Sequence, residues 1–498
     1  MKYCIGIDLG TSAVKTILVN DLGEVVAQSS KSYPLIQEQQ GYSEQDPKLW
    51  VFQTIEALKE MLQQFDGHVN QIEGLSFSGQ MHGLVLLDDQ NDIIRPAILW
   101  NDTRTTKQCH DITSKFGTEI LTITKNKVLE GFSLPKIIWV QENEPENFNK
   151  IKTFLLPKDY VRFALTGKLH MDFSDAAGTL LLDVQKKEWS EEITTHFNIP
   201  LSICPPLTES FEEVGTITEE ISRLTGLSPT TKVFAGGADN ACGALGAGII
   251  NDSTILASIG TSGVVLANES VEEVVDYRGD LHLFNHSKAN TLYSMGVTLS
   301  AGQSLTWLKN TFCQDESFDE MLNGIEDIPV GSLGLLFTPY LYGERTPHTD
   351  ANIRASFVGM DARHTKKHFV RAVMEGITYS LNEILLKYRQ VGKQIEKVVS
   401  IGGGAKNSTW LQMQADIFNI KVVRLQNEQG PALGAAMIAA YGLQWEESFE
   451  QLSKKFLQIK DEYVPILDNV IKYNQLFKIY QTIYQHTKDM NEQLVLYR

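Results

Sequence analysis

Two Gly-Thr-Ser turns, far apart in the chain, carry side chains suited to binding phosphate. One lies in YCIGIDLGTS at residues 3–12 and the other in TILASIGTSG at residues 254–263, each between two apolar runs that predict strands. Glycine lets the backbone approach a phosphate closely, so the turn amides and hydroxyls can donate hydrogen bonds to its oxygens. The hydroxyl donors are Thr11, Ser12, Thr261 and Ser262. Either turn alone could be an ordinary hairpin, but the repetition favours a duplicated unit with two hairpins facing one nucleotide.

A carboxylate at position 239 suggests a reaction. In KVFAGGADNACGALG an apolar strand leads to Gly236 and Gly237, then to Asp239, and then to small residues that predict a helix. Beside a helix N-terminus a carboxylate is expected to stay ionised, and the glycines allow close approach of a substrate. Asp239 can therefore accept the proton of an attacking hydroxyl in phosphoryl transfer. Capping the helix is an equally good interpretation of this segment alone.

Two further segments fit a bound nucleotide. Asp8 ends the first predicted strand just before Gly10, where its carboxylate can hold hydrated Mg²⁺ against phosphates. A simple turn carboxylate is the alternative, although the spacing favours the metal role. In SIGGGAKNSTWLQMQADI at residues 400–417, a glycine turn between strand and helix exposes backbone on which adenosine can lie. Tight strand-to-helix connections use glycine in the same way.

Residues typical of sugar recognition follow a buried strand. SFSGQMHG, residues 76–83, contains Met81 and His82, and ILWND, residues 98–102, contains Trp100 and Asp102. Trp100 can stack on the carbon face of a sugar while His82 and Asp102 bind its hydroxyls. Taken alone, a structural histidine and a core tryptophan are the more common roles.

Composition limits the possible partners. A chain of 498 residues exceeds one hydrophobic core and predicts at least two domains, and its 42% apolar content is ordinary for a globular protein. The excess of 61 acidic over 44 basic side chains gives a net charge of −17, which disfavours nucleic acid and anionic membranes as partners. A polyphosphate ligand would then need backbone amides and a metal ion, for which Mg²⁺ is the natural candidate.

The cysteines and the chain start indicate a cytoplasmic protein. Five scattered cysteines form no CxxC pair, so we expect reduced thiols and neither zinc nor disulfides. The N-terminus leads directly into a predicted strand without a targeting segment, and no apolar run reaches membrane-spanning length. The expectation is a soluble protein of the cytoplasm.

The predicted elements indicate an α/β protein with mixed sheets. An antiparallel meander is expected first, and helices then alternate with strands. Gly243, Gly246 and Gly248 mark a boundary, where glycine serves either as a hinge or in close helix packing. The tail at residues 445–498 is expected to be mostly helical. The other predicted strands are 3–8, 14–19, 24–29, 74–77 and 397–401, and the predicted helices are 47–65 and 369–388.

These motifs resemble the FGGY carbohydrate kinases of the actin, hexokinase and Hsp70 superfamily. GFSLPKIIWVQEN at 131–143 and ASFVGMDARHTKKHFVRAVME at 355–375 are similar to the two family signatures, and the resemblance runs from residue 2 to about residue 442. It implies an α/β fold of two actin-like, ribonuclease H-like ATPase domains with mixed sheets flanking a central cleft. The domains would be residues 1–246, holding the sugar and the base, and 247–498, holding most of the nucleotide. Their closure would exclude water.

The resemblance also implies roles for individual residues. Asp239 would be the base, Met81, His82 and Asn240 would contact the sugar, and Asp8 would assist Mg²⁺. Thr306 occupies a position that varies in the family, and Lys406 makes its turn more basic than usual. The implied ATP ligands are Gly10, Thr11, Ser12, Gly260 and Thr261 at the phosphates, and Gly302, Thr306, Gly403, Gly404 and Asn407 near adenosine.

Within the family, GQMHG, ILWND, LLPKDYVRFALTG, FSDAAGT and YLYGERTPH are most similar to members that phosphorylate the 5-hydroxyl of D-xylulose. Glycerol kinases carry Arg-Glu in place of Met81 and His82, whereas gluconate kinases share Met-His. The alternatives are a kinase for gluconate, L-xylulose, ribulose or a polyol, and a nonenzymatic actin-like protein that uses ATP for assembly. Family analogy also suggests a homodimer.

Overall fold

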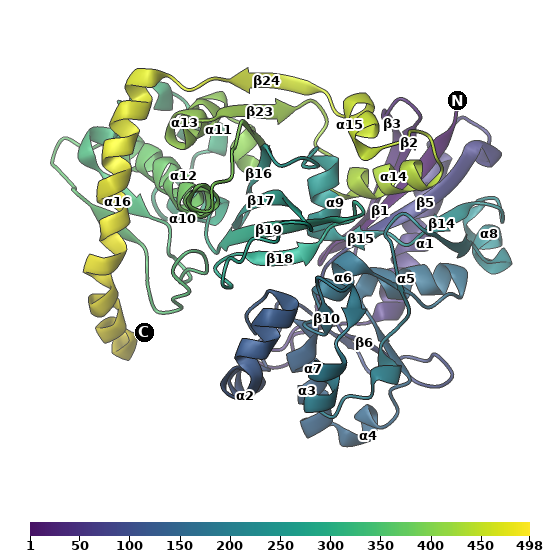
Figure 1. Ribbon diagram of the computed structural model, residues 1–498. Coiled ribbons are helices and arrows are strands. Elements are labelled where there is room, and N and C mark those ends of the chain that lie inside the picture. The colour runs from purple at the N-terminus through teal and green to yellow at the C-terminus, as the bar shows by residue number, and fades with distance from the viewer. The chain divides into compact units, whose positions relative to one another are not determined.

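The computed structural model describes residues 1–498 (Figure 1). These residues form two compact units. The first unit comprises residues 1–250, 269–293 and 429–457. The second comprises residues 251–268, 294–428 and 458–498. Both are α/β units with mixed sheets. The predicted domain division after residue 246 remains a prediction, and the units themselves are interleaved along the chain. No helix combines the length and the apolar character needed to cross a bilayer.

The sheet of the first unit begins with the predicted meander. Strands β1, β2 and β3 pair antiparallel, whereas β5 runs parallel to β1 and to β14, so the sheet is mixed. The strand order is β13-β14-β5-β1-β2-β3, and β15 pairs with β5. The bounds are β1 (Tyr3–Leu9), β2 (Ala13–Asn20), β3 (Val25–Ser32), β5 (Ile72–Gly79), β13 (Glu213–Thr216), β14 (Lys232–Phe234) and β15 (Gly237–Ala238).

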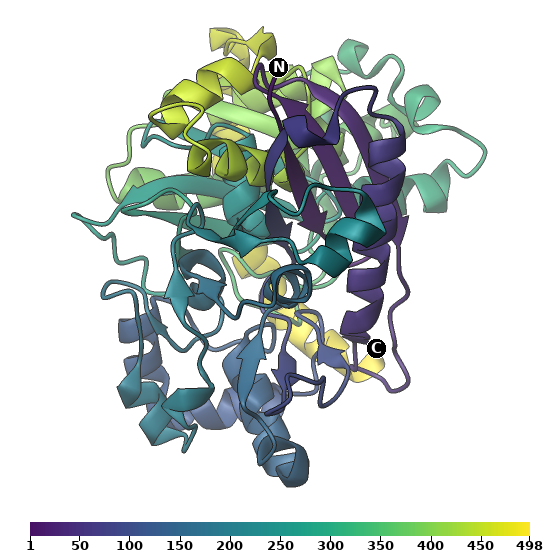
Figure 2. The ribbon, with the colours of Figure 1, turned by 90° about the vertical axis from the view of Figure 1, so that its right-hand side faces the viewer.

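Helices α1 (Pro47–Gln63) and α14 (Pro431–Gly442) pack against this sheet. Helix α1 starts where the Asp46 side chain accepts a hydrogen bond from the amide of Lys48, and proline occupies its first position. Figure 2 shows this long helix beside the strands at the start of the chain. Helix α14 reaches β1 closely at Gly6, where an added Cβ would lie 2.0 Å from the carbonyl oxygen of Ala432.

Helix α9 (Asp239–Gly246) packs closely against α14. This contact explains why residue 246, one of the glycines that mark the predicted boundary, has no side chain. A Cβ at Gly246 would lie 2.5 Å from the carbonyl oxygen of Gly430, and one at Gly434 would lie 1.8 Å from that of Cys242. Backbone atoms cannot yield like a flexible side chain, so neither position accepts a larger residue. Gly246 therefore serves close helix packing.

Short strand pairs and helices complete the first unit. The pairs are β4 (Glu44–Gln45) with β7 (Ala97–Ile98), β6 (Val85–Leu87) with β8 (Thr153–Leu155), β9 (Met171–Asp172) with β12 (Leu207–Thr208), and β10 (Leu182–Asp183) with β11 (Glu188–Trp189). The helices are α2 (Thr106–Thr124), α3 (Ser133–Asn143), α4 (Pro145–Phe148), α5 (Pro157–Thr166), α6 (Phe173–Ala177), α7 (Glu191–His196), α8 (Glu219–Thr225) and α15 (Phe449–Phe456).

The second unit repeats the antiparallel hairpin followed by a parallel strand. Strand β16 pairs antiparallel with β17 and parallel with β22, which runs parallel to β23. Within this unit the sheet order is β19-β17-β16-β22-β23-β24. The bounds are β16 (Thr254–Ile259), β17 (Gly263–Ser270), β19 (Thr291–Thr298), β22 (Lys397–Gly402), β23 (Lys421–Leu425) and β24 (Ile459–Tyr463), and β20 (Leu336–Thr338) pairs with β21 (Ser356–Val358). Strand β18 (His282–Asn285) belongs to the residues of the first unit.

Five helices belong to the second unit, and the tail, which was predicted to be mostly helical, also contains the strand β24. Strand β24 pairs antiparallel with β23, with Val422 opposite Tyr463, because the sheet edge supplies hydrogen-bond partners that a local pattern does not reveal. The helices are α10 (Gly302–Phe312), α11 (Phe318–Leu322), α12 (Lys366–Gln390), α13 (Ser408–Phe418) and α16 (Leu467–Leu494).

Candidate active site

Asp239 is the first residue of α9 and follows a turn that only glycine can form. Gly236 has φ +83°, and a Cβ there would lie 2.3 Å from the carbonyl oxygen of Phe77. The next residues, in β15, pair with the end of β5. The Asp239 side chain is partly exposed, and its Oδ1 accepts hydrogen bonds from the Asn240 amide at 2.7 Å and from Asn240 Nδ2 at 3.0 Å. The predicted carboxylate thus lies where a strand end meets a helix start.

The pKa of Asp239 corrects the expectation of a carboxylate that simply stays ionised. Burial, and to a smaller extent the negative charge of Asp8, raise the pKa to about 7, while the hydrogen bond from the Asn240 amide opposes both. Desolvation and like charge thus outweigh the helix N-terminus. A carboxylate that titrates near neutral pH suits a general base better than one that is always ionised.

Asp8 lies near the end of β1, opposite Lys15 of β2 and Ser78 of β5. Burial raises its pKa, while the Ser78 hydroxyl and the Lys15 ammonium lower it. Its Oδ1 is buried and has no hydrogen-bond partner. Because a buried carboxylate oxygen normally has a partner, this atom fits a cation with a preference for oxygen ligands.

The first Gly-Thr-Ser turn is held in place by surrounding side chains. The Gly10 amide donates to the Ala13 carbonyl at 3.0 Å, and the Thr11 carbonyl accepts from Gln45 Nε2 at 2.7 Å. Trp100 is 45% exposed, and its Nε1 donates to the Thr11 hydroxyl at 2.9 Å. Trp100 is therefore an accessible residue beside the turn and not part of the core.

Met81 and His82 follow β5, in the same unit as Asp239. The Met81 sulfur accepts hydrogen bonds from Asn240 Nδ2 and the Tyr293 hydroxyl, both at 3.6 Å. His82 has φ +67°, and its Nδ1 lies 2.6 Å from the carbonyl oxygen of Gly178. A carbonyl can only accept, so Nδ1 carries the proton of this hydrogen bond. The structure thus joins Asp239, Asn240 and Met81 in one chain of contacts.

A buried lysine in the first signature segment was not predicted as a site residue. Lys136 Nζ donates to the carbonyl oxygens of His82 at 3.0 Å and Gly131 at 2.6 Å, and burial lowers its pKa to about 7. The Phe132 ring lies 4.7 Å from the His82 ring, centre to centre. The only sequence signal was a lysine among apolar residues, which gives no indication of a contact with residue 82.

Asp102 has a different role from the one expected. It is fully buried, and its oxygens accept hydrogen bonds from the Ser43 amide at 2.6 Å and from Arg104 Nε at 2.9 Å, with Arg104 Nη2 at 2.7 Å. The expected contact of Asp102 with sugar hydroxyls therefore has no support in the geometry. The Arg104 guanidinium binds the Asp102 carboxylate instead.

The second unit contains a cavity of about 450 Å³ at its glycine turns. Its wall includes the β16–β17 turn, the start of α10 and the turn that precedes α13. The Gly302 amide donates to the Gly260 carbonyl at 2.8 Å, which brings the first two segments together. The predicted donor Ser262 does not line the cavity, whereas the ATP ligands that the family resemblance implies in this unit all do: Gly260, Thr261, Gly302, Thr306, Gly403, Gly404 and Asn407.

Two α/β units with matching hairpins, a glycine-lined cavity and a carboxylate that titrates near neutral pH have the features of a small-molecule kinase of the actin-like fold. Residues 3–246 match the N-terminal domain of the FGGY family of carbohydrate kinases, and residues 255–443 match its C-terminal domain. The chain belongs to this family.

Several relatives are similar over their full length. The chain is 58% identical to a xylulose kinase of Bacillus subtilis (strain 168), with 100% of both chains covered. It is 50% identical to a xylulose kinase of Lactococcus lactis, with 99% of each covered. Among solved structures, a ligand-bound xylulose kinase from Lactobacillus acidophilus has a TM-score of 0.94 at 28% identity, with 99% and 100% covered. A gluconate kinase from the same species has a TM-score of 0.92 at 29% identity, with 98% of each covered.

Proposed function

We propose that the protein transfers the γ-phosphate of ATP to the 5-hydroxyl of D-xylulose, giving D-xylulose 5-phosphate and ADP. The full-length identity of 58% to a named xylulose kinase supports this substrate. The observation that carries the chemistry is Asp239, whose pKa of about 7 lets it both take and release a proton near neutral pH.

In the proposed reaction Asp239 is the general base. The sugar oxygen forms a bond to the γ-phosphorus, the bond from that phosphorus to the β–γ bridging oxygen breaks, and the hydroxyl proton passes to the Asp239 carboxylate. Asn240 donates two hydrogen bonds to the Oδ1 atom of Asp239, which leaves Oδ2 as the oxygen that receives the proton.

The sugar would be held by residues of the first unit. The His82 ring, which is held by its Nδ1 bond to the Gly178 carbonyl, would contact a sugar hydroxyl. Met81 offers apolar contact, and Trp100 has an exposed indole face for the carbon skeleton. Asp102 is not included, because its oxygens are bonded to Ser43 and Arg104.

The nucleotide would be held by the two Gly-Thr-Ser turns and the cavity of the second unit. The turns at Thr11 and Thr261 would donate to phosphate oxygens, and adenosine would lie against the turn at Gly403. Asp8 would hold Mg²⁺ through its partnerless Oδ1. When bound, the ion screens phosphate charge that a protein with a net charge of −17 would otherwise repel.

ADP release measured across a substrate panel tests this proposal. The panel contains D-xylulose, L-xylulose, ribulose, gluconate and glycerol, and we expect the highest kcat/KM for D-xylulose. Asp239→Ala should abolish turnover while ATP binding, measured by calorimetry, stays near that of the wild type. Asp239→Asn, which keeps the size of the side chain, should lose about a hundredfold to ten-thousandfold in kcat. Near-normal turnover of either variant would refute the base.

Gluconate is the second candidate substrate. It is favoured by the structural similarity to a gluconate kinase, which has a TM-score of 0.92 at 29% identity. A higher kcat/KM for gluconate than for D-xylulose would select this alternative and leave the role of Asp239 unchanged.

A further inference from the structure

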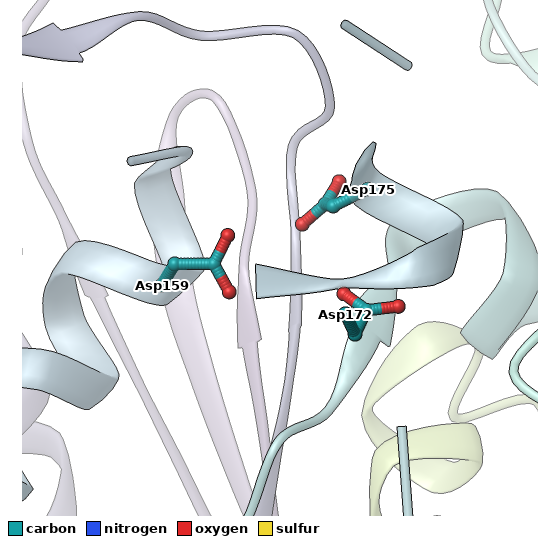
Figure 3. Close-up of side chains that lie close together, drawn as sticks. All are labelled: Asp159, Asp172 and Asp175. Atoms are coloured by element: carbon teal, nitrogen blue, oxygen red, sulfur yellow. The ribbon is translucent and has the colours of Figure 1, made fainter. Parts of the chain in front are cut away.

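A fully buried group of charges lies behind the candidate active site in the first unit. The carboxylates of Asp159, Asp172 and Asp175 come from the first turn of α5, from the residue before α6 and from α6 itself, and they converge (Figure 3). Lys158 Nζ lies 2.6, 2.7 and 2.9 Å from these three carboxylates in turn. The lysine thus supplies the cation that such a donor set would otherwise take from a metal.

A second cation belongs to this group. Arg162 Nη1 lies 2.9 Å from Asp159 Oδ1 and adds a second positive charge. Burial raises the pKa of Asp175 well above its usual value, with the charges of Asp172 and Asp159 adding to the effect. The nearby Lys158 ammonium opposes this increase. Buried ion pairs are costly to form and often no more stabilising than apolar packing, so their presence calls for a role in fixing one conformation.

The charged group is bonded to both ends of the turn that presents Asp239. Asp172 Oδ2 accepts hydrogen bonds from the amide of Ser174, at 2.8 Å, and from its hydroxyl. The Ser174 oxygen in turn accepts from the amide of Ala238 at 2.9 Å. At the other end of the turn, Arg162 Nη1 donates to the carbonyl of Ala235 at 2.6 Å.

The same group is connected to the candidate sugar-binding histidine through α6. This helix begins after Asp172, which caps it, and ends before Gly178, whose carbonyl contacts His82 Nδ1 at 2.6 Å. Three residues of helix, 175–177, therefore separate Ser174, which contacts the Ala238 amide, from Gly178, which contacts His82. A short helix with both ends bonded fixes the distance between the two contacts.

We propose that this buried charge group, acting through Ser174, fixes the position of Asp239 relative to His82. Its members are positioning residues, since none of them contacts the proposed substrate. The inference rests on the proposed function, because it assigns Asp239 and His82 their roles. Loss of the Ser174 hydroxyl would free the Ala238 amide and let the base shift, which costs rate more than substrate binding.

Ser174→Ala tests the proposal, and Ser210→Ala is its matched control. Both serines are buried, and both donate to Asp172 Oδ2, Ser210 at 3.1 Å, but only Ser174 accepts from Ala238. We expect Ser174→Ala to lower kcat by about ten- to a hundredfold and to change the apparent pKa of kcat/KM, with KM for ATP unchanged. Ser210→Ala should lower Tm by a similar amount and keep kcat within about twofold of wild type.

Hydrogen exchange supplies a readout that does not need activity. Peptides covering residues 235–242 should exchange faster in Ser174→Ala than in wild type or Ser210→Ala. If both variants keep kcat, or both lose kcat in step with Tm, the proposal is wrong. If the wild type phosphorylates no sugar of the panel, the proposed function fails, and unchanged exchange in Ser174→Ala would then overturn the positioning role separately. Should Ser174→Ala fail to fold, Ser174→Cys carries the same test, since it keeps a similar volume with a weaker acceptor.

Discussion

At the scale of single residues, the site depends on two carboxylates that affect each other. Asp8 raises the pKa of Asp239 by its negative charge, in addition to the larger effect of burial. A base must be deprotonated to act, so kcat/KM of the wild type should increase with pH and level off above about 7.

Replacing Asp8 by Asn should separate the two causes of the raised pKa of Asp239, which are the charge of Asp8 and burial. Without the neighbouring negative charge the pKa of Asp239 decreases, so the rise of kcat/KM should move to lower pH. The shift should be partial, because burial is the larger cause. The same variant should need more Mg²⁺ for half-maximal rate if Asp8 holds the ion. Asp21→Asn, at a partly exposed turn of the same unit, is the control and should change neither quantity. An unchanged pH profile in Asp8→Asn would mean that Asp8 does not influence the base.

The sequence motifs singled out candidate site residues, but the environments of these residues were not predictable. Asp239 was expected to be ionised, because the pattern around it reveals a helix start and conceals the desolvation. Asp102 was expected to contact sugar, although Arg104, only two residues away, binds it. Lys136 was missed because the contact with His82 spans 54 residues of sequence. Each error arises from a long-range contact or from burial, which a local pattern does not contain.

At the scale of elements, α6 brings Gly178 against the Met81-His82 pair. A Cβ at Gly178 would lie 2.9 Å from His82 Nδ1 and 3.0 Å from Met81 Cε. The backbone of Gly178 has φ −75°, so alanine is allowed there and the conflict is with the side chains alone.

Gly178→Ala should therefore weaken sugar binding without unfolding the unit. We expect KM for the sugar to increase by about tenfold, equivalent to 1.4 kcal/mol, since His82 and Met81 must move. KM for ATP should change little, because the cavity of the second unit contains neither residue. Gly117→Ala is the control, because a Cβ added there would contact only the side chain of Thr113, at 3.4 and 3.7 Å. Gly167→Ala is less suitable, because φ of Gly167 is +70°. Wild-type KM in Gly178→Ala would argue against sugar contact by this pair.

Regular elements followed from the sequence where local and tertiary preferences agree. The predicted helix 369–388 corresponds to α12, Lys366–Gln390, and the predicted strand 397–401 to β22, Lys397–Gly402. Strand β24 was missed because the polar segment IKDEY has no apolar alternation and gains its conformation from pairing with β23. The sequence therefore predicts elements that have a hydrophobic pattern of their own. It does not predict a strand such as β24, which forms because it pairs with a neighbouring strand.

At the scale of the whole molecule, buried carboxylates of the second unit make stability depend on pH. Burial and, to a smaller extent, the negative charge of Glu344 raise the pKa of Glu383 in α12 to about 8, while the charge of Lys387 opposes them. His348, whose Nε2 lies 3.8 Å from Glu383 Oε2, has a pKa lowered to about 4 and is neutral at pH 7. A raised carboxyl pKa stabilises the folded state below the unfolded pKa, and this contribution is lost as the pH increases through about 8.

Glu383→Gln should reduce the loss of stability that the wild type undergoes at high pH. The variant keeps the shape of the side chain without a charge, so at pH 9 it should resist urea better than the wild type, while at pH 5 the two should be similar. The gain should be a few kcal/mol, at about 1.4 kcal/mol for each unit of pKa shift. Glu396→Gln, at an exposed position, is the control. Equal urea midpoints of wild type and Glu383→Gln at pH 9 would show that Glu383 ionises without cost.

Helix α14 has a consequence for synthesis on the ribosome. Residues 431–442 cover β1 and β5, yet they emerge only after nearly the entire second unit has been translated. The nascent first unit must then wait with one face of its central strands uncovered, at the glycine where the helix will later lie against β1. A fragment ending at residue 246 should accordingly bind hydrophobic dyes and precipitate, and adding a separate peptide of residues 429–457 should reduce both effects.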